Sequence, residues 1–197
     1  MNFEYAIQYA QHRLEHELPS TLCYHSVGHT RDEVVPAVTR LARMEGVRGE
    51  PRKLLLTAAW FHDIGFIVQQ PYHELISTRI IREVLPGFGY TPKQVEVVMW
   101  IILATILPQA PHTRLERIMV DADLDVLGSQ DFVLRNQELR REMAQLGKEY
   151  SDESWYTSQI KFIQDHQYFT KSAHTLLDAQ KLVNIAGLRR SLDSLSR

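Results

Sequence analysis

Cysteine is almost absent from this chain, and its absence excludes a disulfide-stabilised fold. Only Cys23 is present among 197 residues, so no disulfide can form within the chain. Small secreted domains use disulfides to compensate for a small core, whereas thiols stay reduced in the cytosol. We therefore expect a cytoplasmic protein, in which Cys23 acts as a small buried hydrophobe.

Long apolar runs and an excess of charge of one sign are also lacking. The longest apolar stretch, 95–107, is too short to cross a bilayer, and residues 1–5 lack the basic and then apolar pattern of a secretory signal. The net charge of −2 creates no global field that would attract nucleic acid or a membrane surface. We expect no membrane partner, and nucleic acid is disfavoured unless a local patch binds it.

Strand signals, repeats and low-complexity segments are scarce, and helical patterns fill the chain. Hydrophobic residues make up 44 % and charged residues 23 %, which is ordinary for a globular protein. Apolar residues recur at helical spacing between proline and glycine stops. The predicted helices cover residues 2–18, 27–45, 51–63, 74–85, 92–106, 113–127, 131–146, 152–168 and 172–190. The fold class is therefore predicted to be all-α, a compact irregular bundle in a single domain, 1–197.

Three of these helices carry further information. Thr91 before Pro92 is a typical cap and first-turn pair, and Thr113 with Glu116 has the spacing of a capping box. The segment 51–63 is apolar on most of its sides, which predicts a central, buried helix.

The most informative motif is His62-Asp63, which lies in Trp60-Phe61-His62-Asp63-Ile64-Gly65 at the end of that apolar helix. A histidine and an acid are both costly to bury without a partner. A divalent metal ion would be such a partner, because neutral imidazole and carboxylate are common ligands of these ions. By itself the dipeptide is weak evidence, so further ligands are needed.

Three other segments place ligand-type side chains at predicted helix ends or faces: His25 and His29, His73 and Glu74, and Asp121, Asp123 and Asp125. Each also has an ordinary structural explanation, as a helix cap, a solvated loop residue or an exposed stripe. On one helix, Asp121 and Asp125 would share a face, and Asp123 would point about 200° away from Asp121. The pair Asp165-His166 has no matching partners and is predicted to lie on the surface.

The order His, His-Asp, Asp on an all-α chain resembles the HD superfamily of metal-dependent phosphohydrolases. Tyr24-His25-x3-His29-Thr30 is similar to the first-ligand helix of that family, and the His62-Asp63 motif to its signature. The segment 121–128 is similar to its last-ligand helix. The resemblance covers about residues 20–130, the expected HD core, and leaves about 131–197 as a helical C-terminal extension. His73-Glu74-x2-Ser77 and Ile102-x2-Thr105 also resemble a small uncharacterised bacterial subgroup.

The resemblance implies four metal ligands: His29, His62, Asp63 and Asp123. His29 is preferred over His25 because the second histidine of a Tyr-His-x3-His element binds metal in related members. Asp123 is preferred over Asp121 because the last ligand of the family follows a small residue, here Ala122, and Asp121 is the fallback.

The resemblance also bears on the number of metal ions. Binuclear members add two histidines between the His-Asp pair and the last aspartate. His73 could be the first, but Thr105, a poor ligand, holds the second place. We therefore expect one divalent ion, with Mn, Fe, Ni, Co, Mg and Zn all open, and a second ion bridged by Asp63 is left open.

Other residues are predicted to assist hydrolysis of a phosphate ester. Asp63 and Glu74 are expected to take part in catalysis, Glu74 as general base or as an orienting group, and His25 or His73 as the acid. Arg31 and Arg79 are candidates for holding the substrate phosphate.

The leading hypothesis is a phosphohydrolase acting on a small phosphorylated metabolite, with a nucleotide as the first substrate class to test. The alternative is a non-catalytic helical module that keeps the metal for sensing or binding. A homodimer is left open.

Overall fold

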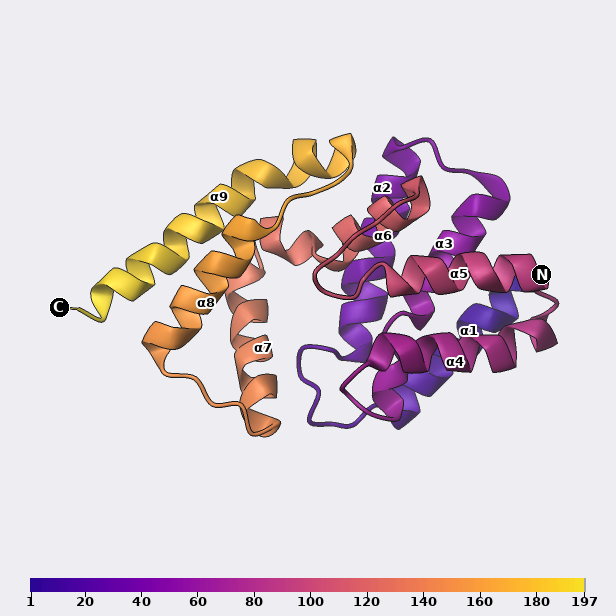
Figure 1. Ribbon diagram of the computed structural model, residues 1–197, viewed down its shortest axis with the longest axis horizontal. Helices are drawn as coiled ribbons and strands as arrows, with labels where there is room; N and C mark the ends of the chain where they lie inside the picture. The colour runs from indigo at the N-terminus through magenta and orange to yellow at the C-terminus, as the bar shows by residue number, and fades with distance from the viewer. Residues whose placement is uncertain (197) are drawn as a thin grey trace. The chain divides into compact units, whose positions relative to one another are not determined.

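The computed structural model describes residues 1–196, and these contain nine α-helices, one π turn, three 3-10 turns and no strand. The predicted all-α class is confirmed, and each predicted helix has an observed counterpart (Figure 1). Within the described residues, none of the helices is long and apolar enough to cross a membrane.

The described residues form two compact units, which we treat separately. The first comprises residues 1–20 and 25–123, and the second comprises residues 21–24 and the chain from Leu124 onward. The boundary therefore lies at Asp123-Leu124, a few residues before the expected end of the core at about 130. The expectation of a single domain stays a prediction.

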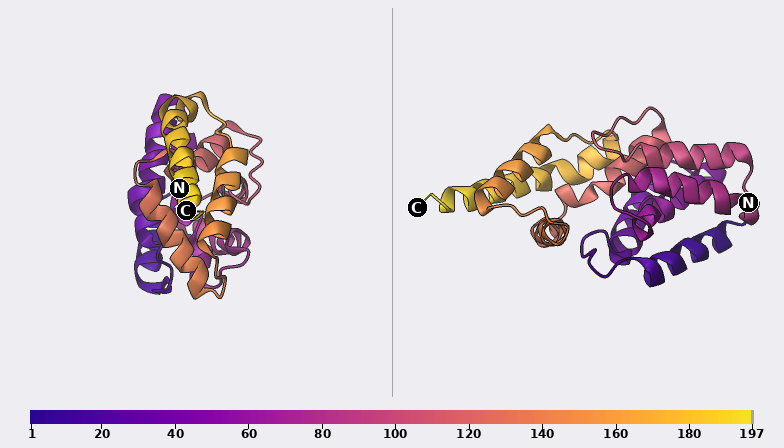
Figure 2. Two further views of the ribbon diagram at one scale, coloured as in Figure 1. Left: turned by 90° about the vertical axis from the view of Figure 1, so that its left-hand side faces the viewer. Right: turned by 60° about the horizontal axis from the view of Figure 1, so that its bottom comes forward.

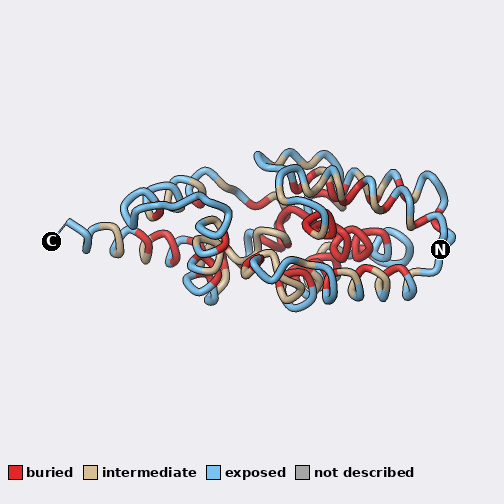
Figure 3. Tube along the Cα trace, turned by 90° about the horizontal axis from the view of Figure 1, so that it is seen from below, coloured by how far each residue is buried: buried red, intermediate tan, exposed pale blue. Residues whose placement is uncertain are grey.

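The first unit is built around one buried helix. Its helices are α1 (Phe3–Glu17), α2 (Val35–Met44), α3 (Gly49–Phe61), α4 (His73–Val84), α5 (Pro92–Leu103) and α6 (Arg114–Asp123). Every residue of α3 from Leu54 to Phe61 is buried, and α1, α2, α5 and α6 all contact it. In Figure 3 the buried residues gather in the interior of the unit. The prediction of a central helix is confirmed.

Both predicted helix caps are present. The Thr91 side chain accepts from the N–H of Gln94, and the Gln94 side chain accepts from the N–H of Thr91, which closes a capping box at α5. Before α6, Glu116 accepts from the N–H of Thr113, while Thr113 Oγ1 accepts from the N–H of Glu116. These bonds satisfy N–H groups that the first helical turn leaves without partners.

The second unit packs three helices around a smaller core. They are α7 (Phe132–Gln145), α8 (Asp152–Asp165) and α9 (Lys171–Ser194), and α8 lies beside α9 (Figure 2). The 3-10 turn Asp125–Gly128 packs on α9 so closely that a Cβ on Gly128 would lie 2.5 Å from Cβ of Leu177. The buried core residues are Leu127, Phe132, Ile163, Ile185 and Leu188.

Three details of the sequence predictions are corrected. The helix predicted over 113–127 ends at Asp123, and residues 125–128 form a 3-10 turn, so Asp125 does not continue the helical face of Asp121. Asn184 of α9 donates to the carbonyls of Leu127 and Ser129, which gives the non-helical backbone its partners. The helix predicted to run to residue 168 ends at Asp165.

The third detail concerns His166, which was expected on the surface. It is only partly exposed, and the Lys181 ammonium lies 3.1 Å from its Nδ1. Burial, with the nearby Lys181 charge, lowers the pKa of His166 to about 4. A half-buried neutral imidazole that accepts a hydrogen bond from the Lys181 ammonium accounts for this packing.

Candidate metal centre

His62 and Asp63 occupy the turn that follows α3. The helix ends at Phe61, and the chain passes into the 3-10 turn Ile64–Ile67. Ser77 of α4 fixes this turn, because its Oγ donates to the carbonyl of His62 at 2.7 Å and accepts from the N–H of Gly65 at 2.9 Å. A Cβ at Gly65 would lie 2.0 Å from the carbonyl oxygen of His73, so only glycine permits this close approach.

His29 begins a π turn, His29–Val34, that runs directly into α2. The N–H of Val35 donates to the carbonyl of Thr30, five residues back. Pro36 follows and has no N–H with which to continue a regular helical ladder. Such local widenings of a helix are frequent at functional sites. The π turn was not predicted from the sequence.

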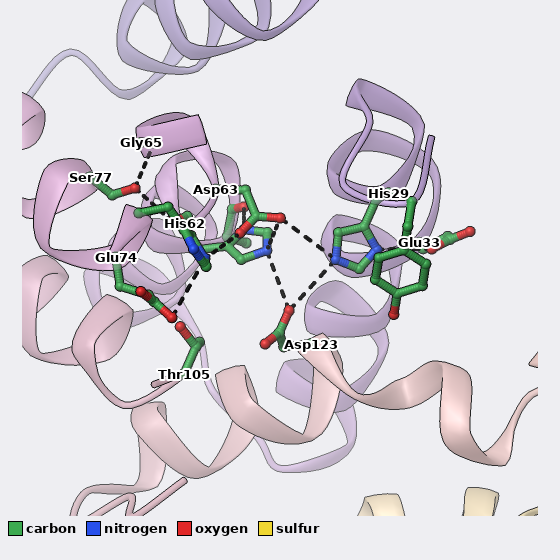
Figure 4. A network of polar contacts seen from close by, with 12 residues as sticks. His29, Glu33, His62, Asp63, Gly65, Glu74, Ser77, Thr105 and Asp123 are labelled. Carbon is green, nitrogen blue, oxygen red and sulfur yellow. Dashed lines mark hydrogen bonds and ion pairs between the residues drawn. The ribbon is translucent and has the colours of Figure 1, made fainter. Parts of the chain in front are cut away.

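Two imidazole nitrogens and two carboxylate oxygens converge at one place. Nε2 of His29 lies 3.8 Å from Oδ2 of Asp63 and 3.7 Å from Oδ1 of Asp123. Nε2 of His62 lies 3.2 Å and 3.3 Å from the same two oxygens. Figure 4 shows the two carboxylates on opposite sides of the imidazole pair. The four predicted ligands are therefore brought together from three separate segments.

The geometry of this cluster fits a divalent ion. Ligand atoms that share one ion at about 2.0–2.2 Å lie about 3.0–3.5 Å apart at neighbouring positions. The ligand atoms of His29, His62 and Asp123 all lie within 4.8 Å of one another. Nε2 of His62 and Oδ2 of Asp63 are buried and form no hydrogen bond of regular geometry among residues 1–196, although they lie 3.2 Å from each other. Buried polar atoms are rarely left without a partner, and a metal ion would supply one.

The second nitrogen of each histidine fixes its tautomer. Nδ1 of His62 lies 2.8 Å from the carbonyl oxygen of Ala59, and Nδ1 of His29 lies 3.0 Å from Oε2 of Glu33. With Nδ1–H donating to these oxygens, each neutral ring directs the lone pair of Nε2 into the cluster. Orientation of a metal-binding histidine by a carboxylate or a carbonyl is a recurrent arrangement.

Within the cluster, the carboxylates raise the pKa values of the two histidines, and the histidines lower the pKa values of the two aspartates. Burial alone would lower the pKa of His29, but Asp123, Glu33 and Asp63 raise it to about 8. The pKa of His62 is likewise raised despite burial, chiefly by Asp63 and Asp123. Burial would raise the pKa of Asp123, but the two histidines lower it to about 2. Two ionised carboxylates and two basic imidazoles form a strong donor set for a cation.

The predicted catalytic residues border the cluster. Nε2 of His73 lies 3.3 Å from Oδ1 of Asp63 and 3.5 Å from Oε1 of Glu74. Phe66 stacks against the ring of His73 at 3.9 Å and against that of His25 at 4.5 Å between centroids. His25, His73 and Glu74 are thus placed beside the ligands, as predicted, although their roles stay predictions.

Two further predictions concern Thr105 and the choice between two aspartates. Thr105 is buried, and its hydroxyl donates to the carbonyl of Ile102 at 2.8 Å, so its proton is committed to the backbone. Asp123 contacts both imidazoles and is grouped with His29 and His62 within 4.8 Å, a group that contains neither Asp63 nor Asp121. Asp63 still lies 3.2 Å from Nε2 of His62, whereas Asp121 is buried in α6. The geometry favours Asp123 as the last ligand.

The two predicted substrate arginines do not reach the cluster. Arg31 is exposed and makes two hydrogen bonds to Asp32, at 2.9 Å and 2.8 Å. Arg79 is exposed on α4. Within residues 1–196, neither guanidinium contacts a predicted ligand.

Sequence reasoning also missed two residues that support the site. Glu33 lies four residues after His29 in the turn, a spacing that allows side chains to meet and could have indicated it. Ser77 formed part of the noted His73-Glu74-x2-Ser77 segment, but its role depends on how α4 packs against the His62 turn.

The comparisons with known proteins leave the family open. No protein-family model and no solved structure matches the chain. A protein of Clostridium beijerinckii named "Uncharacterized protein" is 28 % identical over 100 residues, which cover 49 % of this chain and 62 % of that protein. The match thus spans less than two thirds of that relative. The HD resemblance rests on the motifs and stays a prediction.

Proposed function

We propose that this chain is a metal-dependent phosphohydrolase of the HD type that cleaves a phosphate ester of a small metabolite, with a nucleotide as the first substrate class to test. The observation that carries the proposal is the convergence of His29, His62, Asp63 and Asp123 around two buried atoms that form no hydrogen bond of regular geometry within residues 1–196. These residues also follow the chain order of the HD motifs.

His29, His62, Asp63 and Asp123 would hold one divalent ion. Mixed nitrogen and oxygen ligation suits Mn, Fe, Ni, Co, Mg or Zn. When bound, the ion supplies charge neutralisation for phosphoryl oxygens and lowers the pKa of a bound water. The rest of the chemistry falls to side chains that border the cluster.

Three of those side chains have placements that suit proton transfer. Glu74 is partly exposed beside His73, where its carboxylate accepts a proton from the attacking water. His73 is held between Asp63 and Glu74, where it donates a proton to the leaving oxygen. His25 stacks on Phe66 next to His73 and binds or protonates the same phosphate group.

One observation favours the alternative of a metal-containing sensing module. Hydrolases of phosphate esters commonly neutralise phosphoryl oxygens with cationic side chains as well as with metal. Within the described residues, neither Arg31 nor Arg79 contacts the cluster. A module that binds metal without turnover would not need such contacts.

The two functions separate in a turnover assay. The protein is stripped of metal, reloaded in turn with each of the six candidate ions, and incubated with nucleotides and sugar phosphates while phosphate release is measured. We expect the wild type to release phosphate only when an ion is added, and Asp63→Ala to release none. Asp193→Ala, which removes an exposed carboxylate of α9, serves as the matched control and keeps activity. Metal binding without release on the panel would favour the sensing module, and release that survives Asp63→Ala would overturn the proposed site.

A further inference from the structure

Four arginines line a groove between α2 and α3 of the first unit. It has a volume of about 730 Å³. The lining residues are Val35, Pro36, Thr39, Arg40, Arg43, Val47, Arg48 and Arg52. Half of them are cationic and none is acidic, although the whole chain has a net charge of −2.

The charges of this groove are largely uncompensated. Arg43, Arg48 and Arg52 are exposed, and none of the three makes an ion pair within residues 1–196. Some arginines elsewhere on the chain do pair, as Arg31 does with Asp32 and Arg140 with Asp152. A concave surface lined by one sign of charge concentrates the opposite charge in solution. The groove therefore attracts anions.

The backbone at one end of the groove adds to this field. The thirteen-residue helix α3 begins at Gly49 directly after Arg48, and no side chain caps it. The first N–H groups of such a helix lack backbone partners and carry a partial positive charge. Because Arg48 and Arg52 flank this end, the N–H groups and the guanidinium groups reinforce each other. The N-terminus of α3 adds to the positive field of the arginines, but by itself it would not make an anion-binding site.

We propose that this arginine groove binds a small ligand that carries two or more linked phosphate groups. Guanidinium groups match phosphate oxygens with paired hydrogen bonds. The volume lies within the range of about 300–1,000 Å³ found for small-molecule sites. The lining contains no aromatic side chain on which the bases of a single-stranded nucleic acid would stack. A compact polyphosphate is therefore the better match.

The groove is separate from the candidate metal centre, and the inference does not depend on the proposed function. At about 1.5 Å of rise per residue, Arg52 lies about 15 Å along α3 from His62. Of the two helices that form the groove, α3 leads to His62 at its other end, and α2 follows directly after the π turn that begins at His29. None of the residues that line the groove is one of the four proposed metal ligands.

The test is calorimetric binding of inorganic tripolyphosphate to Asp63→Ala, in which the proposed metal centre is disabled. We expect saturable binding that weakens about tenfold or more in Arg48→Gln/Arg52→Gln, because each lost guanidinium removes charge-assisted bonds. The matched control is Arg189→Gln/Arg190→Gln, which removes two exposed arginines of α9 and leaves binding unchanged. All of the substituted arginines are exposed, and thermal melts check that each variant folds.

Two results would overturn the inference. The first is absence of binding at about 1 mM tripolyphosphate, or equal binding by the groove variant and its control. The second is tighter binding of a single-stranded RNA that depends on Arg48 and Arg52, which would make the groove a nucleic-acid site. Both outcomes are measured in Asp63→Ala, in which the proposed metal centre is disabled. A failure of the proposed hydrolase function therefore cannot be mistaken for a failure of the arginine groove.

Discussion

Oδ1 of Asp123 lies 3.3 Å from Nε2 of His62, although the two residues come from different helices, α6 and α3. The same oxygen lies 3.7 Å from Nε2 of His29. Asp123 is the last residue of α6 as the helix ends before the 3-10 turn. Asp123, the last residue of α6, is therefore the aspartate that contacts both histidines.

The first prediction separates Asp123 from Asp121. Asp123→Asn should weaken binding of Mn²⁺ about a hundredfold or more, because it removes a charged ligand and not merely a supporting group. Asp121→Asn should bind the ion as the wild type does, and should lower the free energy of unfolding because Asp121 is fully buried. Titration calorimetry measures the first effect and urea unfolding the second. Loss of the ion in Asp121→Asn alone would show that the wrong aspartate was chosen.

The second prediction concerns Glu33, whose Oε2 lies 3.0 Å from Nδ1 of His29. Glu33→Gln keeps the size of the side chain and an oxygen acceptor but removes the charge that orients and strengthens the imidazole. We expect an affinity for Mn²⁺ about ten- to a hundredfold lower. Glu15→Gln, at an exposed acid on α1, is the comparison and should leave the affinity unchanged. Equal affinities of the two variants for Mn²⁺ would show that Glu33 does not support metal binding by His29.

The third prediction concerns Ser77, which joins the carbonyl of His62 to the N–H of Gly65. Ser77→Ala leaves both backbone groups buried without this partner, and we expect a loss of about 1–3 kcal/mol in the free energy of unfolding. Metal affinity should fall as well, because the turn that presents His62 and Asp63 loosens. Urea unfolding of the metal-free protein and a metal titration measure the two effects. Unchanged stability would mean that the turn does not need this bridge.

The fourth prediction is a pH dependence that arises in the second unit. The pKa of His166 falls from 6.5 to about 4 on folding, because of burial and the nearby Lys181 charge. Between these values the unfolded chain binds more protons than the folded chain, so stability falls as pH drops through this window and is fully present above it. Because the ring is partly exposed, we expect an effect on the order of 1 kcal/mol.

The control for this effect is His166→Asn, whose amide does not titrate. Urea unfolding followed by circular dichroism at about pH 7 and pH 4.5 should show a larger loss for the wild type than for the variant. Other groups titrate in both proteins and cancel in the comparison. A loss of the same size in both would show that His166 does not contribute.

The positions of the helices were predictable because apolar periodicity and local stops coincide along this chain. Thr91, Thr113 and Glu116 act through bonds within a few residues, so their caps could be predicted and are confirmed. The end of α6 could not be predicted from the sequence, because the apolar pattern continues through Leu127. The break there is supported by Asn184, which bonds the carbonyl of Leu127 from a helix far away in the sequence.

Part of the candidate site could also be predicted from the sequence, and part could not. Four ligand-type residues could be named from motif order, and the structure brings them together. The π turn at His29 and the Ser77 bridge depend on backbone partners and tertiary packing that no local pattern encodes. Arg31 was named as a phosphate contact, and in the structure its guanidinium bonds the neighbouring Asp32, so its role stays a prediction.

The most direct test of the central claim is the metal content of the purified protein. The protein is dialysed against Mn²⁺, freed of loose ions by gel filtration and measured by elemental mass spectrometry. His62→Ala and the control Asp193→Ala, at an exposed acid of α9, are measured beside it. We predict one bound ion per chain in the wild type and in the control variant, and no bound ion in His62→Ala. An empty wild type, or an ion that remains in His62→Ala, would contradict it.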